Sequence, residues 1–568
     1  MRPMLWPEVP EQTALVARRA FPKGSLAIRL RDELGPIFQD ADFVGAFGVR
    51  GRPGIAPSLL MLVTVLQFVE RLTDRQAVQA VAARIDWKYA LSLQLDDPGF
   101  DDSVLAEFRA RLVDNDLARL AFDRLLERCR ELGLVKAGGR QRTDSTHVIA
   151  AVRDLNTMEL AGEAVRALVE ALATVAPGFL AKTVDLEAWT TRYGPPVSAW
   201  RQPRTAAERD ALTLQYGRDG RMLLSAIYTQ HGEWAWLREL PQAAMLCTVL
   251  RQTFLVETDT RGREVMRRRD ANKDGVPPAQ GRLASPYDTD ARWAAKGDEL
   301  FWLGYKLHLT ETCDDPSDQA EHTGRQVPNL ITSVHTTDAT VPDNTATAAI
   351  HQDLAARDLA PGRHYLDAGY PSVPNVLGAR REHGITMVTP LLGDSHRQTK
   401  TANGYSRDDF TIDFDARTAT CPQGQKSATW NQRVQDGIEK IYITFPQRAC
   451  WTCDAQPQCT SSKVRRRGLT LYPRELHEIQ QAARTAQGTK TWRSDYQRRA
   501  GIEGTMNQAA NTVGLRKARY RGIKKVELEH YLGATAINLI RLDAYFTHQP
   551  LDRTHSSQLI RLHAATTN

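Results

Sequence analysis

Apolar residues recur every three to four positions along the first 135 residues, which is the spacing of helices with one buried face. Four such segments stand at 58–72, 73–85, 103–116 and 116–132. Ser58, Thr73 and Ser103 stand at the beginnings of three of them, where short hydroxyl side chains cap helices. The pattern predicts a compact helical domain. It serves either DNA binding through a helix-turn-helix pair or packing and self-association.

The pattern changes after the Gly138-Gly139 turn signal. The stretch RTDSTHV, residues 142–148, is rich in strand formers, and a long, mainly helical stretch then reaches about residue 273. Strand patterns return at 301–313, from 329, before 367 and from 384, with a helix beginning at 344. The order strand, strand, strand, helix, strand, helix, strand predicts a mixed α/β sheet whose first and fourth strands lie side by side.

Asp144 lies inside the first of these strands, although aspartate is among the residues that strands most often exclude. Asp367 ends the fourth strand. If the two strands are neighbours, the two carboxylates face each other. Asp144 then has a functional role, and the alternative is a strand-end cap or a solvent-facing side chain.

A third acid, Glu503, follows Tyr496 and Arg499 at helical spacing, so all three are expected on one face of a helix. Gly501 and Gly504 flank it, and each glycine destabilises a helix interior by about 1 kcal/mol relative to alanine. We therefore expect another backbone or a ligand to approach closely here, rather than an exposed glutamate in a frayed helix. Three carboxylates suit Mg²⁺ or Mn²⁺, and a pair of ions about 4 Å apart supports phosphoryl transfer.

Positive charge is concentrated near this glutamate. The chain carries a net charge of +7, yet residues 490–525 alone hold ten Lys and Arg against Asp495 and Glu503. Aromatic residues, including Tyr520, are interleaved with these bases. Such a segment is typical of a surface that binds DNA or RNA, and the absence of alternating acids disfavours a solvated helix face.

Four of the seven cysteines crowd into one stretch: Cys421, Cys450, Cys453 and Cys459. One CxxC pair with two single cysteines fits either a structural zinc knuckle or free thiols in a small core. Zinc here would be structural, because thiolates are poor ligands for the hard ions that phosphoryl transfer uses. Trp430 and Trp451 in the same stretch could stack on an extruded base or simply pack.

Length and composition are those of a globular protein. The chain has 568 residues, 42% of them hydrophobic and 25% charged, which suggests three or four domains. The longest apolar run, residues 59–69, is too short to cross a bilayer, and the N-terminus lacks a signal peptide pattern. The chain has an odd number of cysteines, seven, scattered along its length, which fits a reducing compartment better than a set of disulfides. We expect a cytoplasmic protein without a membrane partner.

Several segments together resemble the DDE transposases of bacterial insertion sequences, which have an RNase H-like catalytic domain. The resemblance covers TDSTHV, HYLDAGYPS, YQRRAGIEG and the region from 514 to 542. It implies that Asp144, Asp367 and Glu503 are the catalytic acids and that they hold two Mg²⁺ or Mn²⁺ ions. Tyr496 and Arg499 match the family's Tyr-x2-Arg-x3-Glu signature. Ala510 stands where that branch has a DNA-contacting lysine, so this role lapses or passes to the basic residues Arg516, Lys517, Arg519 and Arg521.

The resemblance also implies an organisation and a function. The expected parts are a DNA-binding domain (1–135), a core with a mixed five-stranded sheet (136–155, 290–395 and 476–548), a helical insertion (156–289), a β-rich cysteine insertion (396–475) and a tail (549–568). The protein would cleave and transfer DNA strands at terminal inverted repeats, as a homodimer or higher oligomer that binds transposon ends and target DNA near the bacterial nucleoid. A DNA-binding regulator derived from a transposase and an endonuclease without strand transfer are the alternatives.

Overall fold

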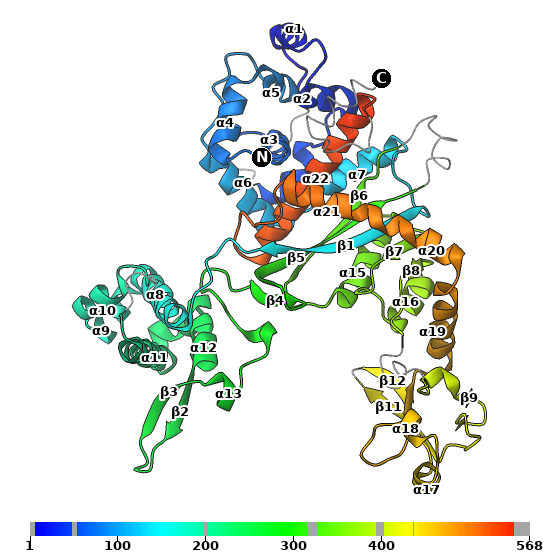
Figure 1. Cartoon of the computed structure of the whole chain (residues 1–568). Helices are drawn as coiled ribbons and strands as arrows, with labels where there is room; N and C mark the ends of the chain where they lie inside the picture. Colours follow the sequence, from blue (N-terminus) through cyan, green and yellow to red (C-terminus); the bar gives the residue numbers. More distant parts are fainter. Residues whose placement is uncertain are drawn as a thin grey trace.

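A six-stranded mixed sheet forms the centre of the computed structural model, which describes residues 6–47, 54–197, 203–314, 327–393, 403–435 and 437–549. Its strands are rich in β-branched and aromatic residues, as the sequence pattern predicts. Helices pack on both faces, so the fold is α/β (Figure 1). The strands are β1 (Arg140–Ile149), β4 (Arg292–Lys296), β5 (Leu300–Thr312), β6 (Ile331–Asp338), β7 (Arg363–Leu366) and β8 (Thr386–Val388).

The sheet confirms that the first and fourth predicted strands are neighbours. β1 runs parallel to β7 and antiparallel to β5, while β7 runs parallel to β8. The sheet has six strands rather than the expected five, because β5 is long enough to pair with two partners in succession. Its first part pairs with β4 and its second part with β6. At the join, a Cβ on Gly304 would lie 2.1 Å from the Val148 carbonyl oxygen, so only glycine fits.

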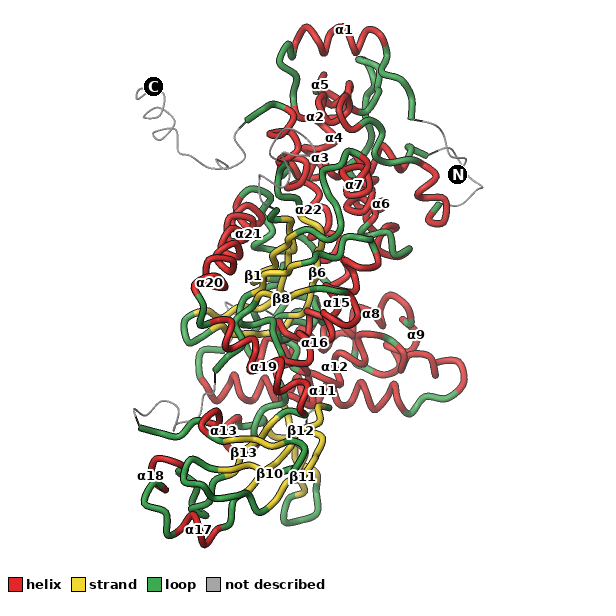
Figure 2. Tube along the Cα trace, turned by 90° about the vertical axis from the view of Figure 1, so that its right-hand side faces the viewer, coloured by secondary structure: helices red, strands yellow, loops and turns green. Residues whose placement is uncertain are grey.

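Helices from distant parts of the sequence flank the sheet. α15 (Asp343–Ala356) and α16 (Val373–His383) lie on one side, and α21 (Ile502–Asn511) lies on the other (Figure 2). α19 (Arg474–Gln487) and α20 (Lys490–Tyr496) lead into α21, and α22 (Ile523–Phe546) follows it. The apolar residues of α22 pack against β6 and against the helices of the N-terminal region.

The N-terminal region is helical, as its sequence pattern predicts. Thr73 caps α4, since its hydroxyl accepts from the Gln76 amide and the Gln76 side chain accepts from the Thr73 amide. Ser58 is not a cap, because α3 begins one residue earlier at a proline, which needs no N–H partner in the first turn. The helices are α1 (Glu11–Ala20), α2 (Leu26–Arg29), α3 (Pro57–Glu70), α4 (Asp74–Ala83), α5 (Ile85–Ala90), α6 (Ser103–Asp114) and α7 (Leu120–Glu131).

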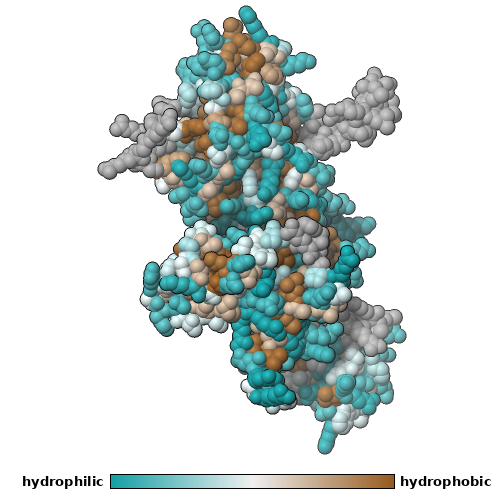
Figure 3. Space-filling model, turned by 90° about the vertical axis from the view of Figure 1, so that its left-hand side faces the viewer, coloured by the Kyte–Doolittle hydropathy of each residue, from teal (hydrophilic) through white to brown (hydrophobic). Residues whose placement is uncertain are grey.

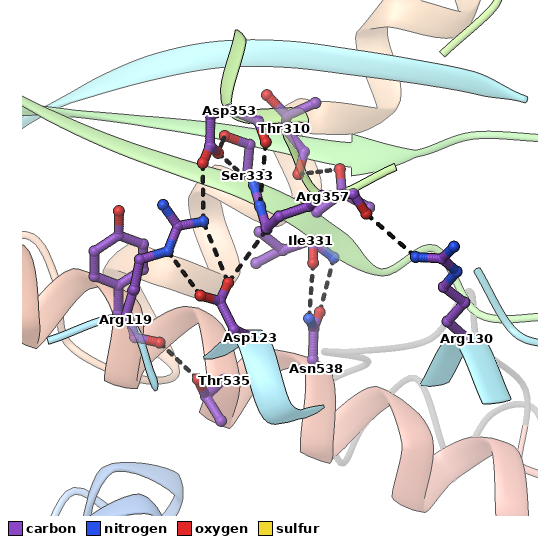
Figure 4. Close-up of polar contacts among 12 residues, drawn as sticks. Arg119, Asp123, Arg130, Thr310, Ile331, Ser333, Asp353, Arg357, Thr535 and Asn538 are labelled. Atoms are coloured by element: carbon purple, nitrogen blue, oxygen red, sulfur yellow. Dashed lines mark hydrogen bonds and ion pairs between the residues drawn. The ribbon is translucent and has the colours of Figure 1, made fainter. Parts of the chain in front are cut away.

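Polar contacts dock α22 and this helical region on the sheet (Figure 4). Asn538 of α22 binds the backbone of Ile331 in β6 twice, accepting from its amide at 2.8 Å and donating to its carbonyl at 2.9 Å. Arg119, at the start of α7, bridges Asp123 and Asp353 of α15. The edge strand is therefore covered where α22 crosses it, and both backbone groups of Ile331 are satisfied. Buried side chains of the helical region, the sheet and α22 form one continuous core.

Two further modules extend from the core, as seen in Figure 1. The first has its own apolar core and a protruding hairpin, and its outer face is mainly hydrophilic with scattered hydrophobic groups (Figure 3). It comprises α8 (Thr157–Val175), α9 (Pro177–Thr183), α10 (Leu186–Tyr193), α11 (Ala206–Tyr228), α12 (Pro241–Thr253), β2 (Phe254–Thr258), β3 (Glu264–Arg268) and α13 (Ala271–Asp274).

The second module, here called the cysteine module, spans residues 403–471 and has a small core of seven buried apolar side chains. Its elements are β9 (Thr411–Asp413), β10 (Thr418–Thr420), β11 (Thr429–Gln435), β12 (Ile438–Thr444), α17 (Gln447–Trp451), α18 (Gln456–Cys459) and β13 (Gly468–Leu471). Across the described ranges, no helix has the length and apolar character needed to span a membrane. The tail, 549–568, lies outside the described residues except for Gln549.

Candidate active site

The sheet brings Asp144 and Asp367 next to each other. Thr143 of β1 is paired with Leu366 of β7, and the two aspartates are the next residues on these parallel strands. The Asp144 side chain is 18% exposed. Burial raises the pKa of Asp144, and the neighbouring Asp367 carboxylate raises it further. The Ser145 amide and Arg499 lower this pKa, but the net shift is upward. The pair therefore carries closely spaced negative charge at a partly buried position.

Arg499 links this pair to the third acid. One guanidinium nitrogen lies 3.0 Å from Asp144 Oδ2 and the other lies 3.0 Å from Glu503 Oε1. The Glu503 side chain is 67% exposed, so it faces an open side of the site. One cation thus bridges two of the three acids that the sequence singles out, although they are more than 350 residues apart in the chain.

Tyr496, Arg499 and Glu503 do not share one continuous α-helix, contrary to the expectation. α20 ends at Tyr496, and a 3₁₀ turn, Gln497–Gly501, precedes α21. Arg142 of β1 explains the interruption, because it donates to the Arg498 carbonyl at 2.7 Å, a carbonyl that a continuous α-helix would offer to residue 502. Tyr496 stacks on Trp492 with ring centroids 4.9 Å apart. It lies in the neighbourhood of the two aspartates, and burial raises the pKa of its hydroxyl.

The two glycines beside Glu503 have different explanations. A Cβ on Gly501 would lie 2.0 Å from a guanidinium nitrogen of Arg142. The group that approaches Gly501 closely is therefore the Arg142 side chain, and not another backbone or a ligand. No atom of the described residues lies within 4 Å of a Cβ on Gly504, so the expected approach of another backbone is absent at that position. Gly501 therefore lets α21 approach β1, which brings Glu503 toward Asp144.

A buried acid that the sequence analysis did not assign holds α21 in place. Glu311 of β5 is fully buried, pairs with Arg142 and Arg541 at 2.7 Å each, and accepts from Thr505 of α21 at 2.5 Å. Burial raises the pKa of Glu311, but the two arginines outweigh it and leave that pKa below its ordinary value. This cluster, the Glu311 clamp, ties β1, β5, α21 and α22 together. A lone glutamate in an apolar strand was its only sequence signal.

A fourth carboxylate also lies beside the aspartates. Asp343, at the start of α15, accepts from Ser145 Oγ at 3.0 Å and pairs with Lys306 at 2.9 Å. A Cβ on Gly369 would lie 3.0 Å from Asp367 Oδ1 and 3.4 Å from Asp343 Oδ2. Both Asp343 oxygens already have partners, so this residue is placed to fix the local backbone around the aspartate pair.

The three acids Asp144, Asp367 and Glu503 offer the type of ligand that a divalent cation needs, because Mg²⁺ and Mn²⁺ prefer carboxylate oxygens. The bridging Arg499 supports this fit, since a positive group already lies between Asp144 and Glu503. Among the described residues, no three His, Cys, Asp or Glu side chains are arranged so that they could hold one metal ion. Arg499 would have to leave before these acids could share a cation.

The four basic residues after α21 differ in their surroundings. Lys517 and Arg521 are exposed. Arg516 contacts the His147 ring at 2.8 Å, and Arg519 lies 4.8 Å over the Phe68 ring and donates to the Leu72 carbonyl. Arg516 therefore ties the segment after α21 to β1, and Arg519 ties the same segment to the helical region, while Lys517 and Arg521 have side chains available to solvent.

All four clustered cysteines line one cavity of about 230 Å³ in the cysteine module. Cys421 Sγ accepts from the Gln425 amide at 3.3 Å. Burial raises the pKa of Cys459 to about 11, and the other three thiols act in the same direction. Trp430 packs edge-on against Phe414, with ring centroids 5.7 Å apart, as the packing alternative predicts, whereas Trp451 is 55% exposed.

Comparison with known families gives two matches. A model described as a transposase DDE domain matches residues 420–543, and a transposase domain model, DUF772, matches residues 16–111. The first match includes Glu503, Arg499 and the four cysteines, whereas Asp144 and Asp367 lie outside both. No curated protein and no solved structure matches the chain. The helical region and the segment that carries Glu503 thus each match a transposase family, and together the two matches support a bacterial insertion-sequence DDE transposase.

Proposed function

We propose that this transposase cleaves DNA at the terminal inverted repeats of its element and joins the freed ends to target DNA. The adjacency of Asp144 and Asp367 on parallel strands, with Glu503 joined through Arg499, carries this proposal. The core is then RNase H-like. Its strand order supports this, since β6, β5 and β1 are antiparallel neighbours and β1 is followed by the parallel strands β7 and β8.

Asp144, Asp367 and Glu503 would hold Mg²⁺ or Mn²⁺, and two bound ions would activate the attacking oxygen and stabilise the leaving oxygen of a phosphodiester. The protein positions the rest. Arg499, released from the carboxylates, lies close enough to hold the phosphate beside the bond that breaks. The Glu311 clamp keeps α21 against the sheet, and the stack of Tyr496 on Trp492 fixes the end of α20.

The DNA path would follow the basic segment after α21. Lys517 and Arg521 are the exposed phosphate contacts in this proposal, while Arg516 and Arg519 act by holding the helical region on the sheet. The helical region, 1–135, would recognise the ends, and a homodimer or higher oligomer would pair two ends near the nucleoid. We propose that the boundaries between the domains lie at residues 135, 155, 289, 395, 475 and 548.

The direct test is an in vitro reaction with purified protein, Mg²⁺, a linear DNA that carries both ends of the element and a supercoiled target plasmid. We expect cleavage at the end junctions and covalent joining to the plasmid. A matched DNA with scrambled ends is the control. Binding without cleavage would support the regulator, and cleavage without joining would support the endonuclease, so either result would contradict strand transfer.

We also propose that Cys421, Cys450, Cys453 and Cys459 hold one structural zinc ion. The small apolar core of the cysteine module supports this, because a module with few buried side chains usually needs a disulfide or a metal for stability. The shared cavity and the amide-to-sulfur hydrogen bond on Cys421 support it as well, although zinc would have to draw the thiols into one coordination group.

Elemental analysis tests the zinc proposal. Protein purified without chelator should carry about one Zn²⁺ per chain and lose it in Cys453→Ser, with a lower melting temperature. Cys247→Ser, which changes a partly buried cysteine of α12, is the matched control and should keep the metal. A metal-free protein whose cysteine module resists proteolysis as well as the zinc-treated protein would remove the proposal.

A further inference from the structure

The far end of the cysteine module carries a group of exposed cations and one exposed indole. Lys463, Arg465 and Arg466 occupy a turn between α18 and β13, here called the basic turn (residues 462–466). Arg448 and Trp451 of α17 are also exposed. In Figure 1, α17 and α18 lie at the end of the module that is farthest from the sheet. This surface is thus separate from the candidate active site.

The basic turn and the indole are held together by hydrogen bonds. Arg465 has a left-handed backbone, with φ at 53°, and its amide donates to the Ser462 carbonyl at 2.8 Å, which closes the turn. The Val464 carbonyl accepts from Trp451 Nε1 and from Gln447 Nε2, each at 3.3 Å. The exposed ring therefore lies beside the cations as part of one defined surface.

Arg467 anchors the end of the basic turn in the interior of the module. Its buried side chain donates to the Cys459 carbonyl at 2.7 Å, and its guanidinium lies 5.3 Å from the centre of the Phe410 ring. The residue directly after the cations is therefore fixed against the cysteine cavity. A ligand that binds the basic turn meets side chains on a positioned backbone, which lowers the ordering cost of binding.

The charge of this surface is not neutralised within the chain. Residues 446–468 contain five basic residues and one acid, Asp454. In the part of the chain that the structure describes, the head groups of Arg448, Lys463, Arg465 and Arg466 form no ion pair. The arginines of the β2–β3 hairpin differ, since Arg267 pairs with Glu257 and Asp274 and Arg268 pairs with Asp210. Unpaired cations favour a polyanionic partner over an internal role.

We propose that the basic turn and Trp451 form a second DNA-contacting surface, which binds the phosphodiester backbone away from the cleaved bond. Three adjacent cations match the regular negative charge of a DNA backbone, and an exposed indole adds stacking on a base or sugar face. The proposal rests on DNA being the substrate. α19 connects the cysteine module directly to α20 and the candidate active site, so one DNA could contact both.

Equilibrium binding to end DNA at several salt concentrations tests this surface. The full-length triple variant Lys463→Gln, Arg465→Gln, Arg466→Gln should lower the slope of log K against log salt by about 2.7, at about 0.9 per lost phosphate contact. Trp451→Ala should weaken binding about tenfold with little change in slope, and Trp451→Phe should restore most of the loss.

A charge-matched triple variant controls for net charge within the same module. Arg417→Gln, Lys426→Gln, Arg433→Gln removes three exposed cations elsewhere and should leave the salt slope near the wild-type value. An unchanged slope in the Lys463 triple variant, with wild-type protein still binding and cleaving, overturns this surface alone. A changed oligomeric state without a changed slope assigns it to a protein partner and also overturns it. Wild-type protein that binds no DNA contradicts the proposed function itself.

Discussion

Asp144→Asn, Asp367→Asn and Glu503→Gln should each reduce cleavage of end DNA by roughly 10³-fold or more while leaving DNA affinity nearly unchanged. Each change keeps the size of the side chain and removes its negative charge. The acids lie at one site through the β1–β7 pairing and the Arg499 bridge, so in the proposed mechanism losing one removes a metal ligand and not a DNA contact. Single-turnover cleavage and gel-shift binding measure the two effects separately.

Arg499→Gln provides the contrast in the same assay. It should slow cleavage at saturating DNA more than it weakens binding, but less than loss of an acid, because Arg499 positions a phosphate in the proposed mechanism. Near wild-type cleavage by any one acid variant would mean that this acid is misassigned. Asp343 is then the next candidate, since it lies beside Asp367, whereas Glu311 is fully buried in ion pairs.

Glu311→Gln should destabilise the protein by about 3–5 kcal/mol, the usual cost of removing one partner from a buried ion pair. The change leaves Arg142 and Arg541 buried with an uncharged partner. Because the clamp holds α21 against β1, unfolding of the core should begin at lower urea concentration. Urea titration followed by circular dichroism measures the shift.

Glu264→Gln is the matched control for the clamp. Glu264 also pairs with an arginine, Arg221, but the glutamate side chain is 63% exposed. Exposed pairs contribute about 0–1 kcal/mol, so this variant should unfold near the wild-type midpoint. Equal midpoints for the Glu311 and Glu264 variants would show that the buried cluster adds no more than a surface pair.

Local patterns in the sequence predicted the N-terminal helices, five of the six strands of the sheet and the chemical candidates. Helical periodicity fixed the N-terminal helices because burial of one face depends only on local spacing. The order of strands and helices predicted the neighbouring strands, and an aspartate inside a strand marked Asp144 because local propensity disfavours it. The crowding of four cysteines was likewise visible from spacing alone, and the structure gathers them around one cavity.

Which of these residues meet, and what else holds them, follows from contacts between distant segments of the folded chain. The bridge through Arg499 and the Glu311 clamp both join residues far apart in the chain, and no local pattern encodes such pairing. The 3₁₀ turn before α21 arises because Arg142 of β1 takes a helix carbonyl. Arg519 and Lys517 are both basic residues of the same segment, yet Arg519 packs against the Phe68 ring while Lys517 is exposed. Exposure is a property of the folded surface, because it depends on which distant segments arrive beside a side chain.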